Sequence, residues 1–182
     1  MATMLHQALD WEIDAPDESL RADPLEWFAA EHARHRQVCR LIAELAEDPG
    51  FHGETMSRLA AFIRTDLARH VAEEEEELFP LLRFRALPED EFETALGQLT
   101  AEHRSEADLA RRVQDILAER LAAGQSPAKD PEAQGVLRAF AAQELQHLAL
   151  ENAVVLPIAR LRLTPDDLAA LGRRLVARSS CP

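Results

Sequence analysis

The sequence predicts an all-α protein: an antiparallel up-down four-helix bundle with an N-terminal arm and a short C-terminal helix. Apolar residues recur at spacings of three and four residues through four long stretches, which is the period of an amphipathic helix. Short segments that contain Pro, Gly and Asp separate these stretches. Alternating β-branched runs and Asn-Gly or Asp-Gly turns, which would indicate strands, are absent from the sequence. Long helices joined by short loops pack as antiparallel neighbours, so a bundle is expected.

The chain divides into three regions. Residues 1–22 are acidic, contain Pro16 and show no clear helical period, so we expect an arm that packs over the bundle. Residues 23–162 carry the four amphipathic stretches and form the expected bundle. Residues 163–182 are expected to form a short C-terminal helix. A chain of 182 residues is long enough to bury one hydrophobic core.

The first two helices are delimited by capping and turn residues. Asp23 can cap a helix that starts at Pro24, and this helix should end near Glu47, before an Asp-Pro-Gly turn. The second helix is expected over about residues 54–85. Pro80 should kink it, because proline lacks an N–H and clashes with the preceding turn.

The remaining helices are delimited in the same way. A Leu-Pro-Glu-Asp turn precedes a third helix that should end at Ala123, where Gly124 suits the position after the last helical residue. The fourth helix should begin at Pro131 and be kinked at Pro157. A short fifth helix is expected over about residues 165–178, after a threonine that can cap it.

Composition and charge exclude several classes of protein. The net charge of −13 argues against binding to the phosphate backbone of nucleic acids, which requires clustered Lys and Arg. One acidic run, Glu73–Glu77, lies within a helix, and most of it should be a solvent-exposed face. The apolar runs are too short to span a membrane, the first ten residues lack the features of a signal peptide, and two cysteines do not suggest a disulfide framework. We therefore expect a cytoplasmic protein with no nucleic-acid or membrane partner.

Two stretches of the chain repeat one pattern. Each has a His, a Glu four residues later, a Pro ten residues later and an Arg thirteen residues later. A His and a Glu four residues apart lie on the same helical face, about one turn from each other. In chain order the two copies are His70, Glu74, Pro80 and Arg83, followed by His147, Glu151, Pro157 and Arg160. The chain therefore has the pattern of a duplicated two-helix unit.

Each of the four long helices carries a His in the middle of its apolar face, and two of them also carry a Glu there. These residues are His32, His70, Glu74, His103, His147 and Glu151. A buried carboxylate without a partner costs several kcal/mol, so burying two of them requires a compensating positive charge. A divalent cation supplies that charge, and neutral imidazoles are further ligands. The sequence therefore predicts a metal site in the bundle, and two carboxylates that can bridge suit a dinuclear site.

Other residues are weaker candidates for this site. His35 lies one turn after His32 and nearly on the same face, so it can replace His32 as a ligand or lie beside the site. Cys39 is expected to be a small core residue. His6, in the arm, and His52, in a loop, are expected to be exposed to solvent.

These motifs resemble those of the hemerythrin-like, or HHE cation-binding, domain. The stretch His-Val-Ala-Glu-Glu-Glu-Glu-Glu-Leu-Phe-Pro, which starts at His70, is similar to the second-helix signature of that family. The stretch His-Leu-Ala-Leu-Glu-Asn, which starts at His147, is similar to its fourth-helix signature. Residues 25–39 are similar to its first helix, and the resemblance covers about residues 24–162.

The resemblance implies an up-down bundle around a non-haem di-iron centre. Four histidines would be terminal ligands of two iron ions, and two glutamates would bridge the ions together with an oxo or hydroxo group. By position the histidines are His32, His70, His103 and His147, and the glutamates are Glu74 and Glu151. Zinc and manganese also accept this set of ligands.

The sequence departs from the oxygen-carrying hemerythrins in two places. Those proteins have a second His on the third helix, where this chain has Ala107. They use an Asp five residues after the His of the fourth helix, where this chain has Asn152 and the acidic residue is Glu151 instead. The loss of one imidazole opens a coordination position. The resemblance therefore implies a protein that binds, senses or detoxifies O2, NO or another small oxidant, or handles iron, rather than a dedicated enzyme.

Two other functions are compatible with a helical bundle. A ferritin-like di-iron oxidase would carry Glu-x-x-His motifs on two helices. Glu144 and His147 fit that pattern once, but Leu67 occupies the position where the second motif requires a Glu. A helical interaction module without metal would use the central histidines only as buried polar groups.

Overall fold

The computed structural model describes residue 9 and residues 13–90 and 92–179, and all regular elements within these ranges are helical. In chain order they are η1 (Glu18–Ala22), α1 (Pro24–Glu47), α2 (Gly53–Phe62), η2 (Ile63–Leu67), α3 (Ala68–Glu73), η3 (Glu74–Leu78), α4 (Phe79–Arg85), η4 (Pro88–Asp90), α5 (Phe92–Ala123), η5 (Pro127–Lys129), α6 (Pro131–Leu150), η6 (Glu151–Val155), α7 (Leu156–Arg162) and α8 (Pro165–Ser179). Short 3-10 helices form η1, η4 and η5, whereas η2, η3 and η6 are π-helical turns. The predicted all-α fold class is confirmed.

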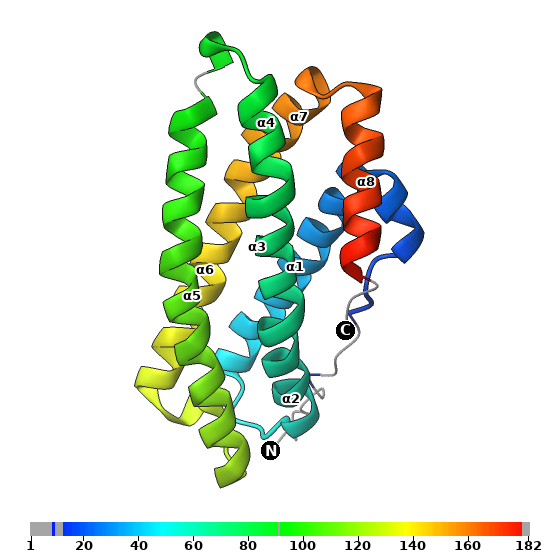
Figure 1. The fold of residues 1–182 in the computed structure, drawn as a ribbon. Coiled ribbons are helices and arrows are strands. Elements are labelled where there is room, and N and C mark those ends of the chain that lie inside the picture. Colours follow the sequence, from blue (N-terminus) through cyan, green and yellow to red (C-terminus); the bar gives the residue numbers. More distant parts are fainter. Residues whose placement is uncertain (1–8, 10–12, 91, 180–182) are drawn as a thin grey trace, which may run out of the picture.

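Long helical segments lie side by side in the described part of the chain (Figure 1). The first is α1, the second runs from α2 through α4, the third is α5, and the fourth joins α6 to α7 through η6. Contacts between α1 and α6, α6 and α5, α5 and α2, and α4 and α7 are consistent with a four-helix bundle. The last helix, α8, packs outside these segments against η1 and α1.

The two prolines of the repeated pattern each follow a π-helical turn. The N–H of Phe79 donates to the carbonyl of Glu74, and the N–H of Leu156 donates to the carbonyl of Glu151. Each of these bonds spans five residues instead of the four of an α-helix. The wider turn accommodates the proline that follows, because proline has no N–H and clashes with the carbonyl four residues earlier. The kinks predicted at the two prolines stay predictions, and the structure shows a π-helical turn before each proline.

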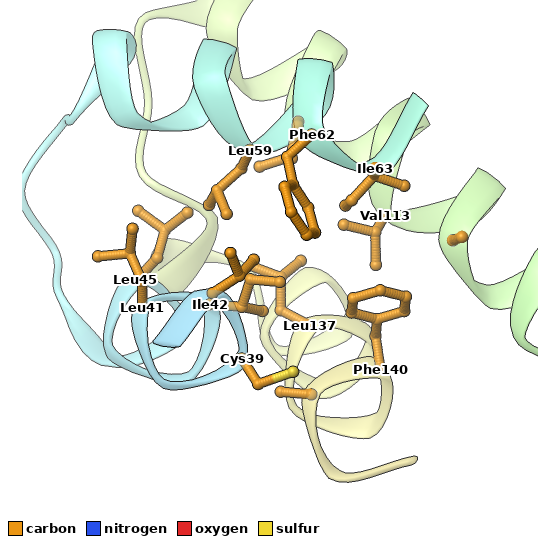
Figure 2. Close-up of a cluster of buried hydrophobic side chains, with 14 of the residues drawn as sticks. Cys39, Leu41, Ile42, Leu45, Leu59, Phe62, Ile63, Val113, Leu137 and Phe140 are labelled. Carbon is orange, nitrogen blue, oxygen red and sulfur yellow. The ribbon is translucent and has the colours of Figure 1, made fainter. Parts of the chain in front are cut away.

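Two hydrophobic clusters fill the space between the long segments. The first joins the C-terminal halves of α1 and α5 to α2, η2 and the N-terminal half of α6. Figure 2 shows this cluster, in which Ile42, Phe62, Val113 and Phe140 from different segments point toward one another. The second cluster joins the N-terminal halves of α1 and α5 to α4, α7 and α8. Burial of these apolar side chains is the main force that holds the helices together.

A layer of buried polar side chains separates the two clusters. Along each long segment, buried His and Glu residues come between the apolar residues of one cluster and those of the other. On α1, for example, His32 and His35 come after Phe28 of the second cluster and before Val38 of the first. The polar layer is therefore enclosed by apolar side chains on both sides.

A buried ion pair attaches η1 to the bundle. Arg21 is only 1% exposed, and its Nη1 donates to Oε1 of Glu73 at 2.7 Å. Nε1 of Trp27 donates to Oε2 of the same carboxylate at 3.0 Å, and the Arg21 guanidinium lies 3.8 Å above the Trp27 ring. The described part of the predicted arm thus packs on the bundle, where Gly172 of α8 lies against the backbone of η1.

Some predictions concern the ends of the chain and membranes. Residues 1–8, 10–12 and 180–182 lie outside the described residues, so the prediction for His6 is not addressed by the structure. Across the described residues no helix is both long enough and apolar enough to cross a membrane.

Gly172 and Gly135 offer a matched test of the contact between α8 and η1. A Cβ at Gly172 would lie 2.9 Å from the carbonyl oxygen of Arg21 and 3.2 Å from that of Ala22, whereas a Cβ at Gly135 meets nothing within 4 Å. We expect Gly172→Ala to lower the free energy of unfolding by about 1–3 kcal/mol, because η1 and α8 must separate. Gly135→Ala should raise it by about 0.5–1 kcal/mol, because alanine favours the helix. Chemical denaturation measures both, and equal effects would contradict the close contact.

Candidate metal centre

Two groups of buried ligand atoms lie next to each other in the polar layer. Within each group, one ligand atom from every residue lies within 4.8 Å of all the others. The first group is His32, His70, Glu74 and Glu151, and the second is Glu74, His103, His147 and Glu151. The groups share Glu74 and Glu151. The structure therefore brings together all six residues that the sequence predicts, as two pairs of imidazoles that flank two shared carboxylates.

In the first group, the ring nitrogens and carboxylate oxygens face one another at similar distances. His32 Nε2 lies 3.4 Å from Glu74 Oε1 and 3.4 Å from Glu151 Oε2. His70 Nε2 lies 3.4 Å from the same oxygen of Glu74. One Glu74 oxygen thus faces both imidazoles of this group. Nitrogen and oxygen atoms at this spacing can converge on one small cation.

The second group has the same composition and a tighter arrangement. His103 Nε2 lies 3.5 Å from Glu74 Oε2, and His147 Nε2 lies 3.0 Å from Glu151 Oε1. The two Nε2 atoms are 3.0 Å apart. Each shared glutamate therefore presents one oxygen to the first pair of histidines and the other oxygen to the second pair.

The repeated sequence pattern positions the two shared glutamates in the same way. The N–H of Glu74 donates to the carbonyls of His70 and Val71, and the N–H of Glu151 donates to those of His147 and Leu148. Each glutamate is also the first residue of a π-helical turn. Turns of this kind are frequent at functional sites because they redirect side chains within a helix.

Several buried polar atoms at the centre have no hydrogen-bond partner among the described residues. They are Nδ1 of His32, both ring nitrogens of His70, Oε2 of Glu74 and both carboxylate oxygens of Glu151. Buried polar atoms are normally satisfied, so such a set requires an explanation. A cation in each group would satisfy the three carboxylate oxygens and one ring nitrogen of His70. The donor set therefore fits a metal ion.

Burial and charge act in opposite directions on the central groups. Burial alone raises the pKa of Glu74, but the imidazoles of His70 and His103 outweigh it and hold the pKa well below its usual range. At Glu151, burial and the charge of Glu74 raise the pKa. Burial lowers the pKa of His70, whereas Glu151 overcomes burial at His147 and raises its pKa to about 11. Without a metal, the second pair of histidines therefore keeps positive charge beside the carboxylates.

Three buried histidines have a carboxylate on Nδ1. His103 Nδ1 lies 2.8 Å from Oε1 of Glu75, and His147 Nδ1 lies 3.0 Å from Oε2 of Glu102. The third, His35, is bonded in the same way to a glutamate of α6. A carboxylate on one ring nitrogen fixes the ring and directs the other nitrogen toward a metal. Sequence reasoning missed these partners, although Glu102 was visible beside His103 and Glu75 lies in the acidic run.

The acidic run is not mainly a solvated face, which corrects the prediction for Glu73–Glu77. Glu73 accepts hydrogen bonds from Arg21 and Trp27. Glu74 belongs to both metal groups, and Glu75 contacts His103. The fourth and fifth pair with arginines of α8. Only Glu76 is exposed, with a side chain 61% accessible. The run faces three different neighbours because it crosses from α3 into the π-helical turn η3.

The structure also addresses the weaker candidates. His32 belongs to the first group, whereas His35 does not and instead bonds Glu144 at 2.9 Å. The Glu144 carboxylate therefore bonds His35. A ferritin-like Glu-x-x-His motif would instead require it to share a metal with His147. The prediction that His52 is exposed is wrong, because its side chain is 12% accessible and lies 3.3 Å from an Asp48 oxygen. Cys39 is buried in the first cluster, as predicted.

The fold and the central cluster define a class of protein: a helical bundle whose buried His and Glu groups suit metal cations. The model of the hemerythrin HHE cation-binding domain family matches residues 23–159. The chain belongs to this family, as the resemblance of its motifs predicted. No match was found among curated proteins.

Glu75 and Glu76 are adjacent in sequence but differ in their contact with the centre, which allows a matched test. We expect Glu75→Gln to weaken Zn²⁺ binding by about 10–100-fold, because His103 loses the carboxylate that orients it. Glu76→Gln should leave the affinity unchanged, because this residue pairs with Arg178 on α8. Calorimetric titration of the metal-free proteins measures both affinities. Equal weakening in the two variants would show that only the charge of the run matters.

Metal binding should release a proton from the second group. Glu74 raises the pKa of His103 to about 9 against the effect of burial, and Glu151 raises that of His147 to about 11. The two Nε2 atoms are 3.0 Å apart and therefore share one proton, and this proton must leave before both nitrogens can bind a metal. We expect release of about one proton per chain from this pair on addition of Zn²⁺ at pH 7, and an apparent affinity that rises with pH up to about 9. A pH indicator in weakly buffered solution measures the release, and its absence would contradict these protonation states.

Proposed function

We propose that the chain is a non-haem di-iron protein that binds a small oxidant such as O2 or NO, in order to sense or remove it. The observation that carries this proposal is the pair of four-residue groups that share Glu74 and Glu151. In the proposal these two residues bridge two ions in an up-down bundle. His32 and His70 are the ligands of one ion, and the other pair of histidines are the ligands of the second.

The chemistry of the donor set is compatible with iron. The groups offer imidazole nitrogen and carboxylate oxygen without thiolate, a set that iron, manganese and zinc accept. Iron would supply the redox chemistry through which a small oxidant is bound. The residues of the chain supply the rest: they hold the ions, orient the imidazoles and keep bulk water out of the layer.

A cavity next to the second group supports the binding of a small ligand. It has a volume of about 340 Å³ and lies between the second long segment and α5. Apolar residues such as Leu67 and Val71 line it, together with His103 and Glu106. Ala107, which occupies the place of the second third-helix histidine in oxygen carriers, also lines this cavity. The small side chain thus leaves space beside a histidine of the centre.

Glu106 provides a polar group in this cavity. The residue is 4% exposed, and its Oε1 has no hydrogen-bond partner among the described residues. It lies 4.0 Å from Nδ1 of His147. A small ligand that enters the cavity therefore has the carboxyl group of Glu106 beside it as a hydrogen-bonding group. We further propose that the protein acts in the cytoplasm without a nucleic-acid or membrane partner.

Metal content and spectrum test this function. Protein purified from iron-supplemented cells should contain about two irons per chain and absorb in the visible range, and the absorption should change on exposure to O2 or NO. Glu74→Gln with Glu151→Gln should abolish the iron pair and its absorption, because both shared carboxylates are lost. Glu54→Gln with Glu119→Gln is the control, since both glutamates are exposed. Wild-type protein without iron or visible absorption would overturn the proposal.

A further inference from the structure

A third group of ligand atoms lies beside the first. Glu31 and His35, both on α1, form it together with His70, and their ligand atoms lie within 4.8 Å of one another. The exposed fractions are 1% for Glu31, 1% for His35 and 3% for His70. The first group uses His32 and the two shared glutamates instead, so His70 is the member that the two groups have in common.

His35 is oriented in the same way as the histidines of the second group. Its Nδ1 lies 2.9 Å from Oε1 of Glu144, which leaves Nε2 to face the interior of this third group. Nε2 lies 3.9 Å from Oε2 of Glu31, with no hydrogen bond between them. The arrangement matches that of His103 and His147, whose Nδ1 atoms also contact carboxylates. A histidine held in this manner presents its free nitrogen to a metal.

The polar atoms of this group are unsatisfied among the described residues. Both carboxylate oxygens of Glu31, Nε2 of His35 and both ring nitrogens of His70 are buried without a hydrogen-bond partner. The nearest guanidinium, that of Arg34, is 3.7 Å from Glu31 and donates its hydrogen bond to Asp66 at 2.9 Å instead. A buried water could bridge such atoms, but it would add no positive charge beyond that of Arg34, which Glu31 shares with Asp66. A divalent cation satisfies both requirements.

We propose that Glu31, His35 and His70 form a further cation site, which captures a divalent transition metal before it reaches the first group. Two imidazoles and one carboxylate suit Fe²⁺, Mn²⁺ or Zn²⁺. His70 serves both groups, and a neutral imidazole has one lone pair to offer, so the two positions alternate rather than fill together. Glu31 and His35 thereby speed the binding of metal to the first group, but they are not ligands once that group holds its ion.

Removing the shared carboxylates isolates this site. In metal-free protein with Glu74→Gln and Glu151→Gln, titration with Co²⁺ should show one bound ion with visible d–d absorption. Adding Glu31→Gln should abolish that ion, whereas adding Glu44→Gln, on an exposed position of the same helix, should retain it. Absence of bound Co²⁺ in the first variant, or its persistence after Glu31→Gln, overturns the proposal. Circular dichroism of the metal-free variants verifies that they are folded.

A second measurement applies if the variants without both shared glutamates do not fold. Glu31→Gln alone should slow Co²⁺ uptake by the metal-free protein at least several-fold relative to Glu44→Gln, with the same final number of ions. Equal uptake rates in these two single variants overturn the proposal. Neither result depends on the proposed oxidant chemistry, because failure of that function would appear in the iron content and spectrum of the wild-type protein instead.

Discussion

Two carboxylates are buried in the middle of the bundle, and nearby positive charge must balance them. The rest of the structure depends on this requirement. Glu74 and Glu151 are at most 1% exposed and face each other across the middle of the helical segments. Two unpaired carboxylates in an apolar interior cost several kcal/mol each, so the fold requires charge of opposite sign in the same place. Four imidazoles surround them, and these can hold protons or share a metal ion with the carboxylates. Oε2 of Glu74 and both oxygens of Glu151 have no hydrogen-bond partner among the described residues, and a cation in each group would contact them.

The rest of the fold positions this layer. The two hydrophobic clusters above and below it fix the helices, so that a histidine from each segment reaches the same depth. The π-helical turns begin at the two shared glutamates and let the helices continue past the prolines. Contacts outside the layer also converge on it: Glu75 orients His103, and Glu73 next to the centre anchors Arg21 of η1.

The helices and the six central residues could be predicted because both follow from the helical spacing of apolar residues along the sequence. The partners of the histidines could not, because they depend on how neighbouring helices are rotated. Glu102 precedes His103 in the chain, yet it bonds His147 of another helix. The prediction that the acidic run is mostly exposed was wrong for the same reason. The sequence pattern indicates a single helix face, whereas the side chains of the run, which enters η3, contact three different neighbours. The prolines predicted kinks, whereas the π-helical turns before them could not be predicted from the residue pattern.

We propose that two metal ions share Glu74 and Glu151. Anomalous diffraction at the iron edge from crystals of the iron-loaded protein tests it most directly, because it locates each ion and its ligands together. We expect two peaks, one against each pair of histidines and both within coordination distance of the shared glutamates. A single peak, or peaks away from these two carboxylates, would contradict it.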